Sequence, residues 1–256
     1  MNSLIAAVGY LYVVLLIGLS LPVQALIFAV TAPFDPSRIA SGRYLRWLGR
    51  RIAGAYPPWK LRVEGRWPPQ DGAFVVVANH QSVLDILLLS HMPREMKWIA
   101  KEELFRVPWV GWMLRMSGDI AIRRGERDSG LEALGRARDH LARGVPVMVF
   151  AEGTRSRDGR LLPFKSGAFR LAIEAGVPVL PVAVNGTGAG MPKGSPWVRP
   201  CEAWARILEP VPTAGLQPED AVKVRDEVRR RIAAQLPAEA PRRRGAAGEG
   251  GDAAPD

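Results

Sequence analysis

The chain has 256 residues, a formal net charge of +10 and one cysteine, Cys201. With 48% hydrophobic and 23% charged residues, the composition excludes a chain that is disordered throughout, and one cysteine excludes an intramolecular disulfide. The length allows one sizeable domain or two small ones.

The N-terminal 34 residues carry no charged side chain, and residues 3–30 form an almost continuous apolar run. As one helix, this run would measure about 42 Å, against roughly 30 Å for the hydrocarbon core of a bilayer. Because Pro22 interrupts it, two arrangements fit: one tilted, kinked spanning helix, or two shorter helices that enter one leaflet. A cleaved signal peptide would need a basic start and a shorter apolar region. We therefore predict a membrane anchor, a helix or helical hairpin, over residues 1–34.

A basic segment follows the apolar run. Residues 36–66 contain eight lysines and arginines and one acidic residue. The positive-inside rule places such a segment, and the chain after it, on the cytoplasmic side of the cell (inner) membrane. Its arginines would contact anionic lipid headgroups. This explains the basic surplus better than nucleic acid does, because we find no nucleic-acid-binding motif and expect no such partner. We assign residues 35–60 as the basic juxtamembrane segment.

The rest of the chain alternates strand-like and helix-like segments. Apolar, β-branched runs predict strands near residues 61–64, 73–78, 96–99, 119–122, 145–151, 178–184 and 202–208. This order predicts an α/β fold: a three-layer α/β/α domain over residues 61–236 with a largely parallel mixed sheet, preceded by the membrane-embedded helical segment. Residues 237–256, rich in Pro, Gly and Ala, predict a disordered tail.

Local signals refine three of these elements. Ser129 and Glu132 have the spacing of a capping box, which predicts a helix that begins there. A helix over residues 165–175 would end at Gly176. Pro181 has no N–H to donate within the sixth strand, so it predicts an edge strand or a bulge.

The segment "VVVANHQSVLDILLL", residues 75–89, combines a buried strand with the start of a helix. Ser82 at the N-cap and Asp85 in the first turn would form a capping box, which by itself leaves His80 unexplained. The carboxyl end of a strand is where α/β proteins place ligands. From one turn into the helix, Asp85 could reach back to the imidazole of His80 and fix its tautomer.

The stretch "NHQSVLD" resembles the first motif of the glycerolipid acyltransferases, specifically the bacterial 1-acyl-sn-glycerol-3-phosphate acyltransferase family. Three further segments resemble the family's other motifs in the family's order: "AKEELFRVPWVGWMLRMSGDIAIRR" at 100–124, "FAEGTRSRDG" at 150–159 and "VPVLPVAVNGT" at 177–187. The resemblance covers about residues 60–210. It implies that His80 is the general base and that Asp85 orients it.

The resemblance also implies substrate-binding roles for six residues of the second and third motifs: Lys101, Arg124, Glu152, Gly153, Thr154 and Arg155. Without the family, Gly153 still permits a close turn, and the hydroxyl and guanidinium that follow could bind a phosphate monoester. A plain turn with a surface arginine fits that stretch equally well. Where the family has an aromatic residue and an acid just before the last arginine of its second motif, this chain has Ala121 and Arg123. The local ion pairing around Arg124 therefore departs from the family pattern.

The activity that the resemblance implies is transfer of a fatty acyl group from acyl-CoA or acyl carrier protein to the sn-2 hydroxyl of lysophosphatidic acid. The product would be phosphatidic acid, and Arg155, helped by Lys101, would hold the phosphate. The acyl thioester is a co-substrate; no cofactor and no metal is expected. With no G-x-S-x-G motif, we expect direct transfer without an acyl-enzyme.

Three competing functions share some of these features. A sibling O-acyltransferase that uses a lyso-ornithine lipid, glycerol-3-phosphate or another lysophospholipid would carry the same motifs. A lipid hydrolase would release free fatty acid without an acceptor and would need a serine or cysteine nucleophile, which we do not find. A non-catalytic, membrane-bound basic scaffold would not depend on His80.

Residues 96–116 mix basic side chains with aromatic ones: Trp98, Phe105, Trp109 and Trp112. Such a mixture suits a membrane interface, while ordinary core packing explains the aromatic residues equally well. Under the family resemblance, part of this region would line the site of the acyl chain, with Gly111 or its neighbours affecting the chain length that is accepted.

Overall fold

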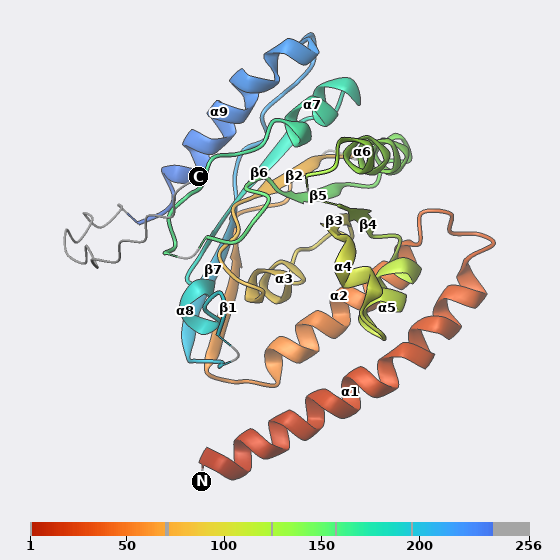
Figure 1. The fold of residues 1–256 in the computed structure, drawn as a ribbon, viewed down its shortest axis with the longest axis vertical. Coiled ribbons are helices and arrows are strands. Elements are labelled where there is room, and N and C mark those ends of the chain that lie inside the picture. The colour runs from red at the N-terminus through yellow and green to blue at the C-terminus, as the bar shows by residue number, and fades with distance from the viewer. Residues whose placement is uncertain (1, 70–71, 124, 157, 196, 238–256) are drawn as a thin grey trace, which may run out of the picture.

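The structure, a computed structural model, describes residues 2–69, 72–123, 125–156, 158–195 and 197–237. In this part of the chain a seven-stranded sheet has the order β1-β7-β6-β2-β5-β3-β4 (Figure 1). Neighbouring strands are parallel except β6 and β7, which are antiparallel. The predicted mixed, largely parallel sheet is therefore confirmed. Its strands are β1 (Trp59–Glu64), β2 (Val75–Ala78), β3 (Lys97–Lys101), β4 (Ile120–Ile122), β5 (Val147–Phe150), β6 (Val179–Asn185) and β7 (Cys201–Ile207).

Helices cover both faces of the sheet, which confirms the three layers (Figure 1). On one face lie α6 (Arg127–Ala142), α7 (Gly167–Glu174) and α9 (Ala221–Ala233), the last preceded by a short 3₁₀ turn at Pro218–Asp220. On the other face lies α3 (Leu84–Leu89), with α2 (Ile39–Gly54) packed against it. The remaining helices are α1 (Asn2–Thr31), α4 (Glu102–Arg106), α5 (Val110–Ser117) and α8 (Thr187–Gly190).

Alternation along β2 assigns its side chains to two separate cores. Val75 and Val77 pack under α6, α7 and α9, while Phe74, Val76 and Ala78 face α3. All five are at most 7% exposed, so β2 is buried on both faces, as its continuous apolar run predicts. The carboxyl end of this central strand is thus held rigidly from both sides.

Pro181 does not lie on an edge strand, because β6 is flanked by β7 and β2. Its carbonyl accepts the N–H of Leu208 at 3.0 Å, so the side that lacks an N–H faces the chain that leaves β7. Ile207 pairs with Val182 and Val211 pairs with Val179, so four residues of the chain leaving β7 lie opposite three residues of β6. The edge prediction is wrong, and the predicted irregularity is present: the ladder is interrupted where the proline has no donor.

The predicted capping box of α6 is wrong. The helix begins at Arg127 with Glu126 at its N-cap, and the hydroxyl of Ser129 accepts the N–H of Arg123 at 2.8 Å. Ser129 therefore fixes the chain that leads into the helix instead of capping it. The stop predicted for α7 is confirmed, because Gly176 has a φ of +65° and donates its N–H to Ile173.

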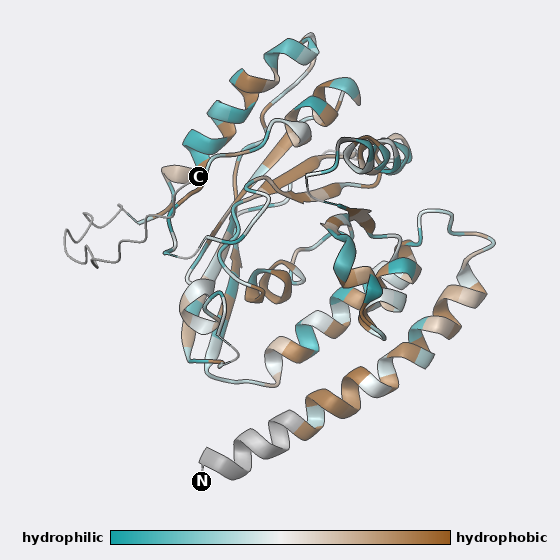
Figure 2. Cartoon of the chain, in the orientation of Figure 1, coloured by the Kyte–Doolittle hydropathy of each residue, from teal (hydrophilic) through white to brown (hydrophobic). Residues whose placement is uncertain are grey.

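The N-terminal apolar run forms one continuous helix, α1, that passes through Pro22. Residues Leu11–Thr31 are long and apolar enough to cross a membrane by length and composition (Figure 2). One side of this helix is docked on the protein: the amide of Gln24, fully buried, donates to the hydroxyls of Ser41 and Ser117 at 3.0 and 2.9 Å. The other side exposes large apolar residues, such as Leu19 and Leu26 at 67% and 66%. The helix is therefore two-sided, with a polar attachment to α2 and α5 and an outward apolar surface.

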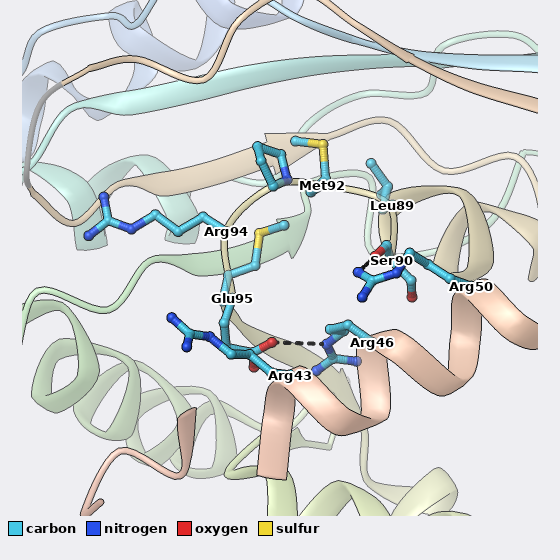
Figure 3. A pocket seen from close by; sticks show the side chains of 10 residues that line it. Arg43, Arg46, Arg50, Leu89, Ser90, Met92, Arg94 and Glu95 are labelled. Carbon is cyan, nitrogen blue, oxygen red and sulfur yellow. Dashed lines mark hydrogen bonds and ion pairs between the residues drawn. The ribbon is translucent and has the colours of Figure 1, made fainter. Parts of the chain in front are cut away.

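The basic segment folds as α2, and one of its arginines is buried in a group of charges that we term the anchor interface: Arg46, Glu95, Lys97 and Asp119. Arg46 Nη2 lies 2.6 Å from both carboxylate oxygens of Asp119, and its Nε lies 3.8 Å from Glu95 (Figure 3). Lys97, fully buried, lies 3.2 Å from Glu95. Burial raises the pKa of Glu95 and lowers that of Lys97. This cluster joins the anchor helices to β3 and β4.

Candidate active site

His80 lies just beyond the carboxyl end of β2, and its ring is held by Asp85. The imidazole Nδ1 is 2.6 Å from Asp85 Oδ2. That oxygen also accepts the N–H groups of Gln81 and Ser82 at 2.8 and 3.0 Å, and Oδ1 accepts the hydroxyl of Thr187. Because Oδ2 serves only as an acceptor here, we assign the proton to Nδ1 and the lone pair to Nε2. The predicted pair is therefore present in the geometry that a general base requires.

Ser82 has a structural role beside this pair. Its hydroxyl accepts the N–H of Leu84 at 3.1 Å and donates to the carbonyl of Met191 at 2.6 Å. The predicted capping box is wrong in its position, because α3 begins at Leu84 with Val83 at its N-cap and no side-chain cap. The hydroxyl of Ser82 and the carboxylate of Asp85 instead accept N–H groups at the junction before the helix, and the same carboxylate contacts His80.

An aromatic ring lies against the imidazole. Phe150, the last residue of β5, stacks on His80 with ring centroids 3.9 Å apart and planes 16° apart, and Trp98 meets Phe150 edge-on at 6.1 Å. The register of β2 and β5 pairs Phe150 with Ala78, two residues before His80. Sequence reasoning gave Phe150 no role, although its place at the end of a strand parallel to β2 was a usable signal.

Glu152 holds the main chain of His80. Its Oε1 accepts the N–H of His80 at 2.7 Å and its Oε2 accepts the N–H of Leu162 at 3.0 Å, while the His80 carbonyl accepts the N–H of Ser156 at 2.8 Å. Burial raises the pKa of Glu152 to about 7, although the two N–H donors oppose this. These contacts are internal, so the geometry favours a positioning role over the substrate-binding role predicted for this carboxylate.

The rest of the third motif forms a turn beside His80. Gly153 has a φ of +68°, and a Cβ at this position would lie 2.8 Å from the side chain of Lys165. The left-handed backbone conformation therefore favours glycine, and the flexible end of the Lys165 side chain lies over it. Thr154 and Arg155 follow, and within the described residues no carboxylate pairs with the guanidinium of Arg155. The turn therefore presents a hydroxyl and an uncompensated cation next to the candidate base.

Lys101 ends β3, which is separated from β2 by β5, so it lies at the same edge of the sheet as His80. Its ammonium is 2.7 Å from Glu103, and its side chain is 46% exposed. Arg124 lies outside the described residues. The preceding Arg123 pairs with Glu102 and Glu126 at 3.0 and 2.8 Å, which is the local departure in ion pairing that the sequence indicates. The roles predicted for Lys101 and Arg124 stay predictions.

The aromatic segment divides between the interior and the surface. Trp98 and Phe105 are each 5% exposed and belong to the interior. Trp109 and Trp112 are 43% and 50% exposed, and their ring centroids lie 5.6 Å apart. Gly111 has a packing reason, because a Cβ there would lie 2.1 Å from the carbonyl oxygen of Phe105. The glycine allows α4 and α5 to approach closely.

Thr187, at the start of α8, was missed as a site residue, although the fourth motif ends on it. Asn79 was also missed: its side chain exchanges two 2.8 Å hydrogen bonds with the backbone of Val184 and so joins the ends of β2 and β6. The other histidines lie elsewhere: His91 lies two residues after the end of α3, and its Nδ1 is 3.0 Å from the carbonyl oxygen of Leu87. His140 is half-buried in α6, and burial lowers its pKa to about 4.

Comparisons with known proteins identify the family of this chain. A family model described as "Acyltransferase" matches residues 60–185. A 1-acyl-sn-glycerol-3-phosphate acyltransferase of Chlamydomonas reinhardtii is 37% identical over 88% of this chain and 67% of its own length. The chain belongs to this acyltransferase family. It is therefore an enzyme that transfers acyl groups, and the hydrogen-bonded His80 and Asp85 lie within the matched region.

Two further similarities extend over the same region. A human 1-acyl-sn-glycerol-3-phosphate acyltransferase alpha is 37% identical over 66% of this chain, which spans 62% of the human protein. The crystal structure of the 1-acyl-sn-glycerophosphate (LPA) acyltransferase PlsC from Thermotoga maritima superposes with a TM-score of 0.64 and 30% identity, over 90% of this chain and all of that one. The fold of this acyltransferase is thus shared with a solved relative.

Proposed function

We propose that this acyltransferase moves a fatty acyl group from acyl-CoA or acyl carrier protein to the sn-2 hydroxyl of lysophosphatidic acid, forming phosphatidic acid. The observation that carries the proposal is the His80–Asp85 pair, with Nδ1 and Oδ2 2.6 Å apart, beside a turn that carries the guanidinium of Arg155. The names of the relatives supply the acceptor.

In the proposed reaction, Nε2 of His80 takes the proton of the sn-2 hydroxyl as the oxygen attacks the thioester carbonyl. The imidazolium that forms is stabilised by Asp85 through Nδ1–H. When the tetrahedral intermediate collapses, the C–S bond breaks and the thiolate leaves with the proton returned by the imidazolium. An alcohol is weakly nucleophilic near neutral pH, so a base held in place contributes about 10²–10⁴-fold.

The acceptor's phosphate is assigned to Arg155, with Lys101 at the same edge of the sheet as a further cation. The family resemblance adds Arg124. A guanidinium matches two phosphate oxygens at once and so fixes orientation as well as position. The N–H of Ser156 donates to the carbonyl of His80, so a phosphate held on this turn lies on the segment that touches the base. Fixed placement of this kind turns attack by the hydroxyl into an intramolecular step.

We place the enzyme at the cell (inner) membrane with its catalytic domain on the cytoplasmic side. Support comes from the exposed apolar side of α1 and from the arginines that follow it in the sequence. Because Gln24 attaches the same helix to α2 and α5, the domain is held close to the lipids that it uses.

The test is a profile of paired substrates with purified enzyme. Lysophosphatidic acid, glycerol-3-phosphate and a lyso-ornithine lipid are each combined with acyl-CoA and with acyl carrier protein, and thioester consumption is followed. We expect the highest kcat/KM with lysophosphatidic acid. Transfer to the lyso-ornithine lipid or to glycerol-3-phosphate, without transfer to lysophosphatidic acid, would refute the proposed acceptor, and release of free fatty acid without an acceptor would indicate a hydrolase.

A further inference from the structure

A lysine that sequence reasoning did not single out, Lys193, lies against the phosphate-binding turn. Its ammonium donates to the carbonyl oxygen of Arg155 at 2.8 Å and to the hydroxyl of Thr154 at 3.3 Å. Lys193 follows α8, in a loop between the fourth motif and β7. It therefore reaches the turn from a segment about forty residues further along the chain.

The loop that carries Lys193 is itself attached to the catalytic pair. Two residues before the lysine, the carbonyl of Met191 accepts the hydroxyl of Ser82 at 2.6 Å. At the start of the same segment, Thr187 donates its hydroxyl to Asp85. One short stretch of chain thus contacts the first motif at one end and the third motif at the other. The position of the Lys193 ammonium is therefore fixed relative to His80.

The local charges leave this ammonium without a compensating acid. Within the described residues, no carboxylate pairs with Lys193 or with Arg155, and Lys165 brings a third cation against Gly153. Glu152, the acid of the same turn, is 5% exposed, and its oxygens accept backbone N–H groups. By contrast, Lys101 is paired with Glu103 at 2.7 Å. Three cations around one turn form a field that attracts an anion.

We propose that Lys193 is a substrate-positioning residue that binds the acceptor's phosphate together with Arg155. An ammonium has three donors; two are used by the Arg155 carbonyl and the Thr154 hydroxyl, and the third is left for a phosphate oxygen. Because the Thr154 oxygen accepts from Lys193, its own hydrogen is free to donate to the same phosphate. This inference rests on the proposed function and adds to it a further cation of the phosphate site.

This arrangement would act on acceptor choice more than on the chemical step. The ammonium interacts with the phosphate both before and during acyl transfer, so its loss should raise KM for a phosphate-bearing acceptor and leave kcat nearly unchanged. A neutral acceptor such as monoacylglycerol has no group for Lys193 to bind. Lys193 therefore discriminates phosphate monoesters from neutral alcohols.

The experiment compares Lys193→Met and Lys193→Arg with wild type, using the full chain in detergent micelles and a saturating acyl donor. Lys223→Met is the matched control, because Lys223 lies on α9, 84% exposed and paired with Asp220. We expect Lys193→Met to raise KM for lysophosphatidic acid about tenfold to a hundredfold, the range for a lost charge-assisted hydrogen bond. The arginine variant should recover most of the loss, and the control should match wild type.

Two further readouts separate binding from structural support. Inorganic phosphate, tested as an inhibitor competing with the acceptor, should bind Lys193→Met more weakly by a similar factor, and the KM for the donor should stay within about twofold of wild type. An equal loss of kcat with charged and neutral acceptors would overturn the proposal, because it would mean that Lys193 only supports the turn. A change confined to the donor's KM, or no change at all, would also overturn it.

Failure of the proposed acceptor would be visible separately. It would appear in the wild-type enzyme as absence of transfer to lysophosphatidic acid, before any variant is compared. The inhibition by inorganic phosphate would then still test Lys193, with whichever acceptor the wild type uses. A weaker inhibition in Lys193→Met and a recovery in Lys193→Arg would support the anion site, and equal inhibition in all three proteins would contradict it.

Discussion

The catalytic edge, formed by His80, Asp85, Glu152 and Arg155, and the anchor interface both contain buried charges, yet they differ in what the charges face. In the anchor interface, Arg46 takes both oxygens of Asp119, and Lys97 is paired with Glu95. At the catalytic edge, the carboxylates are also fully engaged, but Nε2 of His80 is the ring nitrogen left for a substrate. The paired charges of the anchor interface hold helices and strands together, whereas the network around His80 leaves its Nε2 available to accept a proton.

The two regions are joined by aromatic contacts. The guanidinium of Arg46 lies 4.7 Å from the ring of Trp98, which meets Phe150 edge-on, and Phe150 stacks on His80. The helix that follows the membrane segment is therefore connected to the base by a continuous set of packed side chains. Substitutions in the two regions should separate orientation of the base from stability of the fold.

Asp85→Asn should have the largest effect on turnover. The neutral amide lacks the negative charge that holds the Nδ1 proton, and it places an NH2 group where one carboxylate oxygen accepts in wild type, either toward the Thr187 hydroxyl or toward the ring and the two backbone N–H groups. We expect kcat to fall by about 10²–10⁴-fold, since the imidazole loses its orientation and the partner of its charged form. Steady-state kinetics at saturating substrates measures this, and a loss below about tenfold would contradict the assigned role.

Asp119→Ala should instead act on stability. It leaves Arg46 buried with only Glu95 at 3.8 Å, and removing one partner of a buried ion pair costs about 3–5 kcal/mol. Denaturant unfolding in detergent measures the loss, with Glu202→Ala in the exposed pair with Lys60 as the control that should change little. Below the unfolding transition, kcat per folded molecule should match wild type; a loss of kcat without a loss of stability would place Asp119 in the catalytic function.

Local patterns predicted the fold and the catalytic pair because their causes are local. His80 and Asp85 are five residues apart at one strand-to-helix junction, so both can be read from one stretch. Buried strands such as β2 have the continuous apolar runs of a strand covered on both faces. The anchor helix could likewise be predicted from its length and composition alone.

Non-local partners could not be predicted, because the strand order decides them. Phe150 reaches His80, Thr187 reaches Asp85 and Lys193 reaches Arg155 only because β5 and β6 flank β2. These sequence separations exceed the reach of any periodic pattern. Ser129 was misassigned for a related reason. Its hydroxyl accepts the N–H of Arg123, before the helix, and the spacing of a capping box gives no information about that hydrogen bond. For Pro181 the sequence left an edge strand and a bulge open, because the irregular chain opposite it cannot be seen from β6 alone.

Glu152→Gln should change how stability depends on pH. The pKa of Glu152 is raised from 4.5 to about 7 in the folded protein, so folding favours the protonated carboxyl. The stabilisation that this shift gives the folded protein is complete below pH 4.5, the pKa in the unfolded chain, and is lost as pH rises through about 7. Relative to Glu152→Gln, the unfolding free energy of wild type should fall by up to about 3 kcal/mol between pH 4.5 and 8. Parallel pH profiles of the two proteins would contradict this.

Phe150→Leu should give the smallest effect. It keeps an apolar side chain at the end of β5 but removes the ring that stacks on His80 at 3.9 Å. An aromatic pair contributes about 0.5–1.5 kcal/mol beyond its buried area, so kcat should fall a few-fold, to about tenfold at most. Phe150→Tyr, which preserves the stack, is the matched variant and should stay close to wild type. Equal kcat in the leucine and tyrosine variants would show that the aromatic stack on His80 does not contribute to turnover.

The central claim is that the imidazole of His80 removes the acceptor's proton, and its most direct test is single-turnover acyl transfer by His80→Ala. Enzyme in excess over acyl-CoA is mixed with lysophosphatidic acid, and wild type and variant are compared at the same folded concentration. We predict a rate of C–S cleavage lower by about 10²–10⁴-fold, with the melting temperature and the acceptor's affinity preserved. A rate within tenfold of wild type would show that another group takes the proton and would contradict the account.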